Sequence, residues 1–413
     1  MSVDRSVLPE GLREDPAPDV VTDPAQAFSP SAPYPDWEAR AQRGPHAGGA
    51  ERGTGARDGR KSAAQALAED SSLRSGSAAR PRIGPGILLL AVLASALVAL
   101  TLGPADIRLP ELWAVLLDRL GLARAGAEIS PLRAAIIWEL RLPRILVALA
   151  AGAGLALTGA VMQALTRNPL ADPYLLGLSS GAALGAVLAL LAGAAVLLPL
   201  GAFLGSLLAL ALALGIAQLL GGASPSRAIL AGICISALAS AATSALIFWT
   251  ATGDSYREIL AWLMGSLAGS VWSDAALAIG ALLLCAPVIL IAGRALDAFT
   301  FGEVSAAALG VDVVRLRWIL LVISALLTGV MVALGGAIGF VGLVVPHAVR
   351  LFAGAAHRRV LPASMLVGGL FLLWADTAAR SLFAPRELPV GIVTALVGAP
   401  IFFAILLRYR RQT

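Results

Sequence analysis

Apolar positions in this chain are grouped in long blocks. After residue 82, uncharged apolar runs of about 20 residues recur, and each is long enough to cross a hydrocarbon core of about 30 Å. Few runs show the two-residue alternation of a membrane β-strand, so helices are favoured. The pattern predicts an all-α membrane protein with ten transmembrane helices, at 83–103, 145–165, 175–195, 197–219, 228–250, 274–293, 316–336, 341–355, 361–382 and 389–407.

Residues 1–82 have a different composition. They hold 12 of the 26 acidic and 11 of the 31 basic residues, with many Pro, Gly and Ser. Such a segment cannot bury enough apolar surface to offset its ordering entropy. The first apolar run begins only at Ile83 and is too long for a secretory signal peptide. We therefore predict a disordered cytoplasmic N-terminal tail at 1–82, followed by a membrane domain at 83–413.

Composition supports the membrane class, and charge gives an orientation. The chain has 413 residues, 58% hydrophobic and 14% charged, with a mean hydropathy of +0.82; soluble domains carry roughly 25% charged residues. The net charge of +5 comes from arginine, because Lys61 is the only lysine. In a membrane protein this reports topology rather than nucleic-acid binding. Arg74, Arg80 and Arg82 precede the first run, so ten spans leave both termini in the cytoplasm.

One predicted outer segment departs from this charge rule. Residues 104–144 hold six arginines against five acids, and Arg141 and Arg144 flank Pro143 in ELRLPRIL. Positive charge is normally sparse on the outer side of a membrane, although long segments translocate largely regardless of charge. The rule alone does not explain these arginines.

Residues suited to catalysis are few. None of the three histidines belongs to an HExxH-type metal motif, and the sequence contains no G-x4-G-K-[ST] phosphate loop. The chain is therefore predicted to be no enzyme, to need no cofactor or metal, and not to hydrolyse ATP itself. Asp376 is the clearest acid within a span. Arg380, one helical turn later, either neutralises it or shares a functional role with it.

Three smaller features allow specific expectations. Cys234 and Cys285 lie in apolar runs and are predicted to be buried hydrophobes. The short span 341–355 contains Pro346, which predicts either a half-length or broken helix at a cavity or an ordinary kink satisfied by its neighbours. In the loop 294–318, EVSAAALG predicts a short helix from Glu303 to Gly310. This helix is either a plain connector or an element that docks into another protein.

Several long motifs resemble the FecCD family of permeases, the membrane subunits of ABC importers for ferric siderophores, haem and cobalamin. These motifs are LRLPRILVALAAGAGLALTGAVMQALTRNPLADPYLLGLSSGAALGAV, FGEVSAAALGV, GGAIGFVGLVVPHAVRLFAGAAHRRVLPAS and WADTAARSLFAPRELPVGIVTALVGAPIFFAILLR. The resemblance implies a type II ABC importer permease fold in a bacterial cell membrane. It also implies a homodimer with two ATPase subunits and an external substrate-binding protein.

The resemblance assigns roles to individual residues. Docking of the binding protein falls on Arg141, Arg144 and Arg380, and ATPase coupling on Gly302, Glu303 and Gly310. A cytoplasmic gate is expected near Ser224 and Ser226, although Pro225 departs from the family pattern. Small residues of the fifth span either line a translocation path or serve helix packing; they are Ala231, Gly232, Ser236 and Ser240.

Substrate and mechanism leave alternatives. The resemblance favours an iron chelate, a ferric siderophore or haem, with cobalamin as the alternative. His347 could ligate haem, but its motif GLVVPH is common to the family. A stand-alone secondary transporter would show intramembrane acids or a filter, and a membrane enzyme would show clustered His or Asp; neither is evident in the sequence.

Overall fold

The computed structural model describes residues 84–105, 107–122, 130–221, 224–250, 253–383 and 386–410. The predicted tail at 1–82 lies outside the described residues. Every regular element in the described part of the chain is helical, which confirms the all-α prediction.

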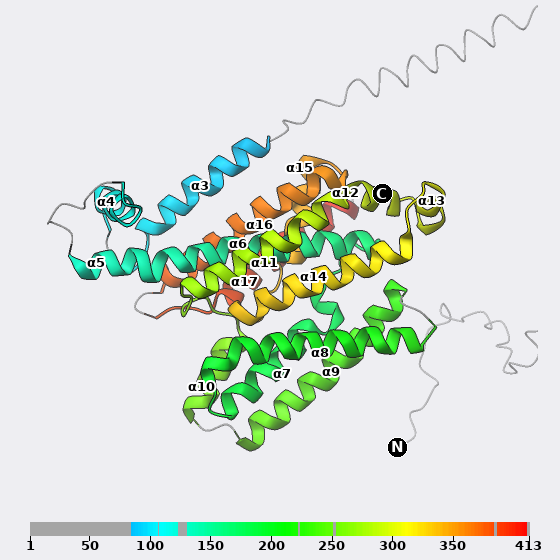
Figure 1. Ribbon diagram of the computed structural model, residues 1–413, viewed down its shortest axis with the longest axis horizontal. Helices are drawn as coiled ribbons and strands as arrows, with labels where there is room; N and C mark the ends of the chain where they lie inside the picture. The colour runs from blue at the N-terminus through cyan, green and yellow to red at the C-terminus, as the bar shows by residue number, and fades with distance from the viewer. Residues whose placement is uncertain are drawn as a thin grey trace, which may run out of the picture. The chain divides into compact units, whose positions relative to one another are not determined.

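The helices follow one another along the chain with short connections (Figure 1). Their bounds are α3 Pro85–Thr101, α4 Leu109–Arg119, α5 Pro131–Ala135, η2 Ile136–Arg141, α6 Leu142–Thr166, η3 Pro173–Leu176, α7 Leu178–Leu191, η4 Ala195–Leu197, α8 Leu198–Leu219, α9 Pro225–Thr250, α10 Gly253–Leu263, α11 Trp272–Ile291, α12 Gly293–Phe299, α13 Glu303–Ala308, α14 Val313–Gly335, α15 Val341–Ala353, α16 His357–Ser381 and α17 Val390–Arg410.

Six helical segments in the described part are long and apolar enough to cross a membrane: Pro131–Thr166, Leu198–Leu219, Ser226–Thr250, Trp272–Ile291, Val313–Gly335 and His357–Ser381. Four shorter apolar helices, Pro85–Thr101, Leu178–Leu191, Val341–Ala353 and Val390–Ile405, coincide with the other predicted spans. The structure therefore supports a multi-pass membrane protein, and the number ten stays a prediction.

Helix α6 lies at the centre of the bundle, where α16, α11, α15 and α14 pack around it (Figure 1). Almost every residue from Pro143 to Leu165 is buried. Glycines allow the closest approaches, because a Cβ added to Gly152 would overlap the carbonyl of Gly368 and one added to Gly159 would overlap that of Gly342. Close backbone contact through small residues is the usual way in which membrane helices associate.

Helices α7, α8 and α9 form a second group of neighbours (Figure 1). Gly181 faces Gly205 across the contact between α7 and α8, and Gly185 faces Gly201 one turn away. Both pairs leave no room for a side chain, so α7 and α8 also pack backbone against backbone. Hydropathy alone extends the α7 span back to residue 175, but Gly177, with φ 84°, separates it from the 3₁₀ turn η3.

Helix α15 is continuous through Pro346, so it is not broken there, but its 13 residues make it the half-length helix that one alternative named. A proline cannot donate a hydrogen bond to the carbonyl four residues earlier, which here is that of Gly342. Gln163 of α6 supplies the missing donor, because its Nε2 lies 3.4 Å from the Gly342 oxygen and 3.0 Å from the Leu343 oxygen. The irregular backbone is thus satisfied by a neighbouring helix.

A side chain of another element also binds the connection from α14 to α15. Phe340 adopts a left-handed conformation, with φ 68°, directly before α15. The hydroxyl of Tyr174, in η3, donates to the Ile338 carbonyl at 3.0 Å and lies 3.3 Å from the Ile338 amide. One side chain therefore serves both backbone groups of a non-helical residue.

Candidate functional site

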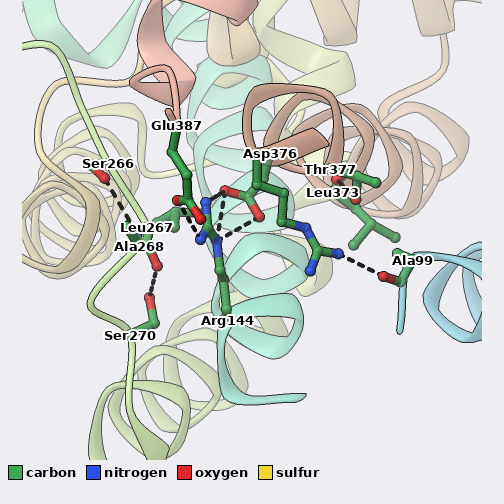
Figure 2. Close-up of polar contacts among 11 residues, drawn as sticks. Ala99, Arg144, Ser266, Leu267, Ala268, Ser270, Leu373, Asp376, Thr377 and Glu387 are labelled. Atoms are coloured by element: carbon green, nitrogen blue, oxygen red, sulfur yellow. Dashed lines mark hydrogen bonds and ion pairs between the residues drawn. The ribbon is translucent and has the colours of Figure 1, made fainter. Parts of the chain in front are cut away.

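Five residues from three segments form what we call the arginine cluster: Arg141, Arg144, Asp376, Arg380 and Glu387. Arg144 lies in the first turn of α6, between the other two segments (Figure 2). Its Nε is 2.9 Å from Asp376 Oδ2 and its Nη2 is 2.9 Å from Asp376 Oδ1. Its Nη1 is 2.8 Å from Glu387 Oε2. Arg144 and Asp376 are buried, whereas the Glu387 side chain is 38% exposed.

The other two arginines of the cluster hold the end of α3. Arg141 donates to the carbonyls of Leu100 and Ala105 at 2.6 and 2.5 Å. Arg380 donates to the carbonyl of Ala99 at 2.6 Å. The last carbonyls of a helix have no intrahelical donor, so both arginines donate to carbonyls that would otherwise lack a hydrogen-bond partner.

These contacts add a partner that the sequence did not predict. The spacing of Asp376 and Arg380 allowed either mutual neutralisation or a shared functional role, and Asp376 takes its hydrogen bonds from Arg144. Arg380 points instead to α3, as the contact with Ala99 shows. Arg141 likewise contacts carbonyls of the last turn of α3 and of the residues that follow it.

The positive charge of residues 104–144 is thus compensated largely from outside the segment, since the acids that bind Arg144 are Asp376 and Glu387. In addition to the cluster, Arg133 of α5 lies 2.5 Å from Glu111 of α4. Docking of a binding protein on Arg141, Arg144 and Arg380 stays a prediction. Because all three are at most 8% exposed, docking requires that a partner's carboxylates reach them or replace their present acceptors.

The predicted coupling element is present as α13, Glu303–Ala308. It is bounded by Gly302, with φ 98°, and Gly310, with φ 82°, conformations that favour glycine. Glu303 begins the helix and lies 2.5 Å from Arg317 Nη2, which ties α13 to the start of α14. The predicted start and stop of this helix are confirmed, while its role in coupling stays a prediction.

Helix α13 and its flanks expose large apolar side chains. Phe301 is 76%, Val304 86% and Leu309 70% exposed. Positive charge gathers at the same end of the bundle, at Arg167, Arg294, Arg315, Arg317, Arg350, Arg358 and Arg359. This is the charge pattern expected of the cytoplasmic end. An exposed apolar surface of this kind marks a site of contact with another protein or with the membrane.

The predicted gate and path residues divide between two environments. Ser224 caps α9, since its Oγ accepts from the amide of Arg227 at 3.4 Å, and Ser226 is exposed. Gly232 is buried so closely against Leu175 of η3 that a side chain would not fit, which favours the packing interpretation for this glycine. Ser236 is half-buried, and Ser240 is exposed, with its Oγ 3.4 Å from that of Ser180 in α7.

The cysteine and histidine predictions have mixed outcomes. Cys285 is buried as predicted, but Cys234 is exposed, so that expectation is wrong: it lies on the face of α9 that the chain leaves uncovered. His347 is buried inside α15. No group of three or more His, Cys, Asp or Glu side chains within the described residues could hold a metal ion.

Sequence reasoning missed several polar residues that contribute to the site. Glu387 had a visible signal, an acid at the edge of the last span, but its partner lies 243 positions away. Asp172, in the loop after α6, accepts a hydrogen bond from the Tyr174 amide at 2.9 Å. Burial raises the pKa of Asp172 to about 6, against the lowering effect of that hydrogen bond.

Comparisons with known proteins agree with this architecture. Residues 88–408 match the profile of the FecCD transport family. The chain is similar to the cobalamin import system permease protein BtuC of Halobacterium salinarum, with 44% identity over 67% of this chain and 74% of that protein. It is similar to the hemin transport system permease protein HmuU of Yersinia pestis, with 39% identity over 81% and 98%.

Two further proteins are similar to this chain: one is named for a different substrate, and the other is a solved structure that supports the fold. The molybdate import system permease protein MolB of Haemophilus influenzae is 38% identical over 80% of this chain and 97% of that protein. A solved metal-chelate type ABC transporter in an inward-facing conformation has a TM-score of 0.68 and 36% identity, covering 78% of this chain and 97% of that one. The chain therefore belongs to the FecCD transport family, as an ABC importer permease.

Proposed function

We propose that this chain is the membrane subunit through which an ATP-driven importer moves an iron chelate, a ferric siderophore or haem, into a bacterial cell. An external binding protein delivers the chelate, and a separate ATPase drives transport. The similarity to a hemin permease and to a metal-chelate type transporter supports this class of substrate. Cobalamin is the alternative, because other relatives are named for its import.

The observation that carries the proposal is the surface of α13. Val304, Phe301 and Leu309 are exposed beside an arginine-rich end, on a short helix fixed by Glu303 to Arg317. An amphipathic helix laid in a groove of another protein is a common mode of recognition. A helix that is bound to α14 through Glu303 and presents apolar side chains to a partner is suited to transmit movement of an ATPase to α14.

A row of serines on α9 supports a homodimer with a path between the two copies. Ser240 and Ser244 are exposed one turn apart, Ser236 precedes them at the same helical spacing, and Ser240 lies beside Ser180 of α7. Hydroxyl groups gain nothing from contact with lipid tails, whereas they suit a surface that is hydrated or faces a second copy. A path lined by small hydroxyl and methyl groups would bind its cargo weakly, which leaves specificity to the binding protein.

The arginine cluster is our candidate for docking of the binding protein. Arginine suits this role, since its planar fork binds carboxylates in pairs of hydrogen bonds. Glu387 is the partner of Arg144 that is most open to exchange, because its side chain is 38% exposed while that of Asp376 is 1% exposed. A carboxylate of the binding protein would replace Glu387 and leave the buried pair intact.

The partner assignment is tested by placing a charge on α13. Val304→Glu should abolish co-purification of the ATPase and lose substrate uptake, because a carboxylate cannot be desolvated in an apolar groove. Val196→Glu is the matched control: Val196 is 92% exposed in η4, far from α13 in sequence and outside the arginine-rich end. Normal ATPase binding by Val304→Glu would refute the assignment.

Substrate class is tested by uptake. A strain that lacks the permease, complemented with this chain and its own binding protein and ATPase, should take up labelled haem or a ferric siderophore. Labelled cobalamin and molybdate are the comparison substrates. Uptake of cobalamin alone would establish the alternative, and uptake of molybdate alone would refute the chelate proposal.

A further inference from the structure

A cavity of about 440 Å³ lies at the arginine-rich end, between the starts of α3 and α16 and the end of α15. Its walls are mainly apolar and include Leu88, Phe352 and Pro362. Arg358 and Arg359 complete its lining. The family roles described above do not use this cavity, because the coupling helix and the arginine cluster lie elsewhere in the fold.

The two arginines of the cavity have charge available for a ligand. Both side chains are exposed, and within the described residues neither forms an ion pair. The nearest acid of this region, Asp297, already binds the backbone amide and the Nδ1 of His357, both at 2.8 Å. The stem of Arg358 lies against Gly293, with Cγ 3.5 Å from the position of an added Cβ, so its guanidinium is held near the cavity.

Backbone geometry adds to this positive charge. Helix α3 begins after Gly84 without a side-chain cap, whereas the first amide of α16, that of His357, already donates to Asp297. The first amides of a helix carry partial positive charge and attract anions. The start of α3 therefore adds to the positive charge of the two arginines at the cavity.

The apolar walls indicate what kind of anion fits. They continue onto the exposed side of α3, where Ile87, Leu90 and Leu93 are 63%, 67% and 55% exposed. A free phosphate would contact only the arginines, whereas a phospholipid would place its phosphate there and its acyl chain along α3. Basic pockets between membrane helices on the cytoplasmic side are suited to such head groups.

The chain that leads into α3 is a weaker candidate for this cavity. Its last acid is Asp70, and Arg74, Arg80 and Arg82 follow before Gly84. Like charges repel the arginines of the cavity, so this segment would strengthen the attraction for an anionic lipid instead of replacing it.

We infer that the cavity between α3, α15 and α16 binds an anionic phospholipid from the inner leaflet, with its phosphate on Arg358 and Arg359. The lipid would fix the start of α3 to α16, an edge of the bundle where the packing is otherwise open.

The test uses the full chain in nanodiscs that contain phosphatidylglycerol or only phosphatidylcholine, with retained lipid counted by native mass spectrometry. Wild-type protein should retain phosphatidylglycerol. The double variant Arg358→Gln with Arg359→Gln should retain at most about one tenth of the wild-type amount. Arg294→Gln with Arg315→Gln is the matched control, because both are exposed arginines of the same end outside the cavity. Ala363→Phe fills the cavity without changing charge and should also reduce retention.

Three results would overturn the inference. The first is equal retention of phosphatidylglycerol by wild type and both cavity variants. The second is displacement of the lipid by excess inorganic phosphate, which would identify a free-phosphate site. The third is lipid retention that appears only after residues 1–79 are deleted, which would show that the N-terminal segment occupies the cavity.

Discussion

Replacement of Asp376 by asparagine should destabilise the protein more than replacement of Glu387, the other carboxylate of the arginine cluster. The carboxylate accepts three hydrogen-bond contacts from Arg144, at 2.9 to 3.1 Å, and both side chains are buried. Removal of one partner of a buried ion pair leaves an uncompensated charge and costs about 3–5 kcal/mol. Glu387 still neutralises part of the Arg144 charge, so we expect a loss near the lower figure.

Glu387→Gln is the matched control for this prediction. It also removes one carboxylate from Arg144, but from a side chain that is 38% exposed and already hydrated. Exposed ion pairs contribute about 0–1 kcal/mol. The difference between the two variants should therefore be about 2 kcal/mol or more, and it isolates the effect of burial from that of charge.

The measurement is the free energy of unfolding in mixed micelles, titrated with a denaturing detergent for wild type and both variants. A combined variant, Arg144→Met with Asp376→Leu, should recover part of the stability lost by Asp376→Asn, because it removes both buried charges together. If Asp376→Asn costs less than about 1 kcal/mol, or no more than Glu387→Gln, the buried pair does not stabilise the bundle as argued.

Three further predictions concern packing, coupling and pH. Gly368→Ala should cost about 1–3 kcal/mol of unfolding free energy, because its Cβ would overlap α6, while Gly280→Ala, which meets open space, should be neutral; equal effects on thermal unfolding would contradict this. Gly310→Pro forces a negative φ where the chain has 82°; it should leave folded protein that hydrolyses ATP without uptake, whereas Gly310→Asn should retain coupled uptake, and coupled uptake by the proline variant would count against the coupling role. The Asp172 carboxyl has a folded-state pKa raised to about 6, so its contribution to stability is complete below pH ~4, its unfolded value, and is lost as the pH rises through about 6. Asp172→Asn should remove about 1–1.5 kcal/mol of this pH dependence between roughly pH 5 and pH 7.5, and an unchanged stability–pH curve would refute the buried-carboxyl argument.

Local signals in the sequence predicted local structure well. The start of α13 at Glu303 and its stop at Gly310 depend on a carboxylate near the first turn and a glycine in a left-handed conformation. Both effects act within one helical turn, so neighbouring residues determine them. The apolar runs predicted the described apolar helices for the same reason. A segment that crosses a hydrocarbon core must be apolar along its own length, whichever helices pack beside it.

Partners across the bundle could not be predicted in this way. Asp376 is one turn from Arg380 but binds Arg144, 232 positions away. The arrangement of the packed helices decides which side chains meet. Pro346 posed the same problem: its effect on α15 depends on Gln163, a residue of another helix. The sequence shows that such groups need partners, and only the packing shows which partners they have.

The burial of α6 also bears on how the protein is made. Its span is 89% buried in the folded chain, whereas the span of α9 is 28% buried. A helix that contacts mainly protein in the folded state does not need an apolar surface for lipid. The Pro131–Thr166 segment is nevertheless as apolar as the others, at a hydropathy of 2.2. Membrane helices insert individually and associate afterwards. The composition of α6 therefore reflects its passage through the insertion machinery, before its neighbours have been synthesised.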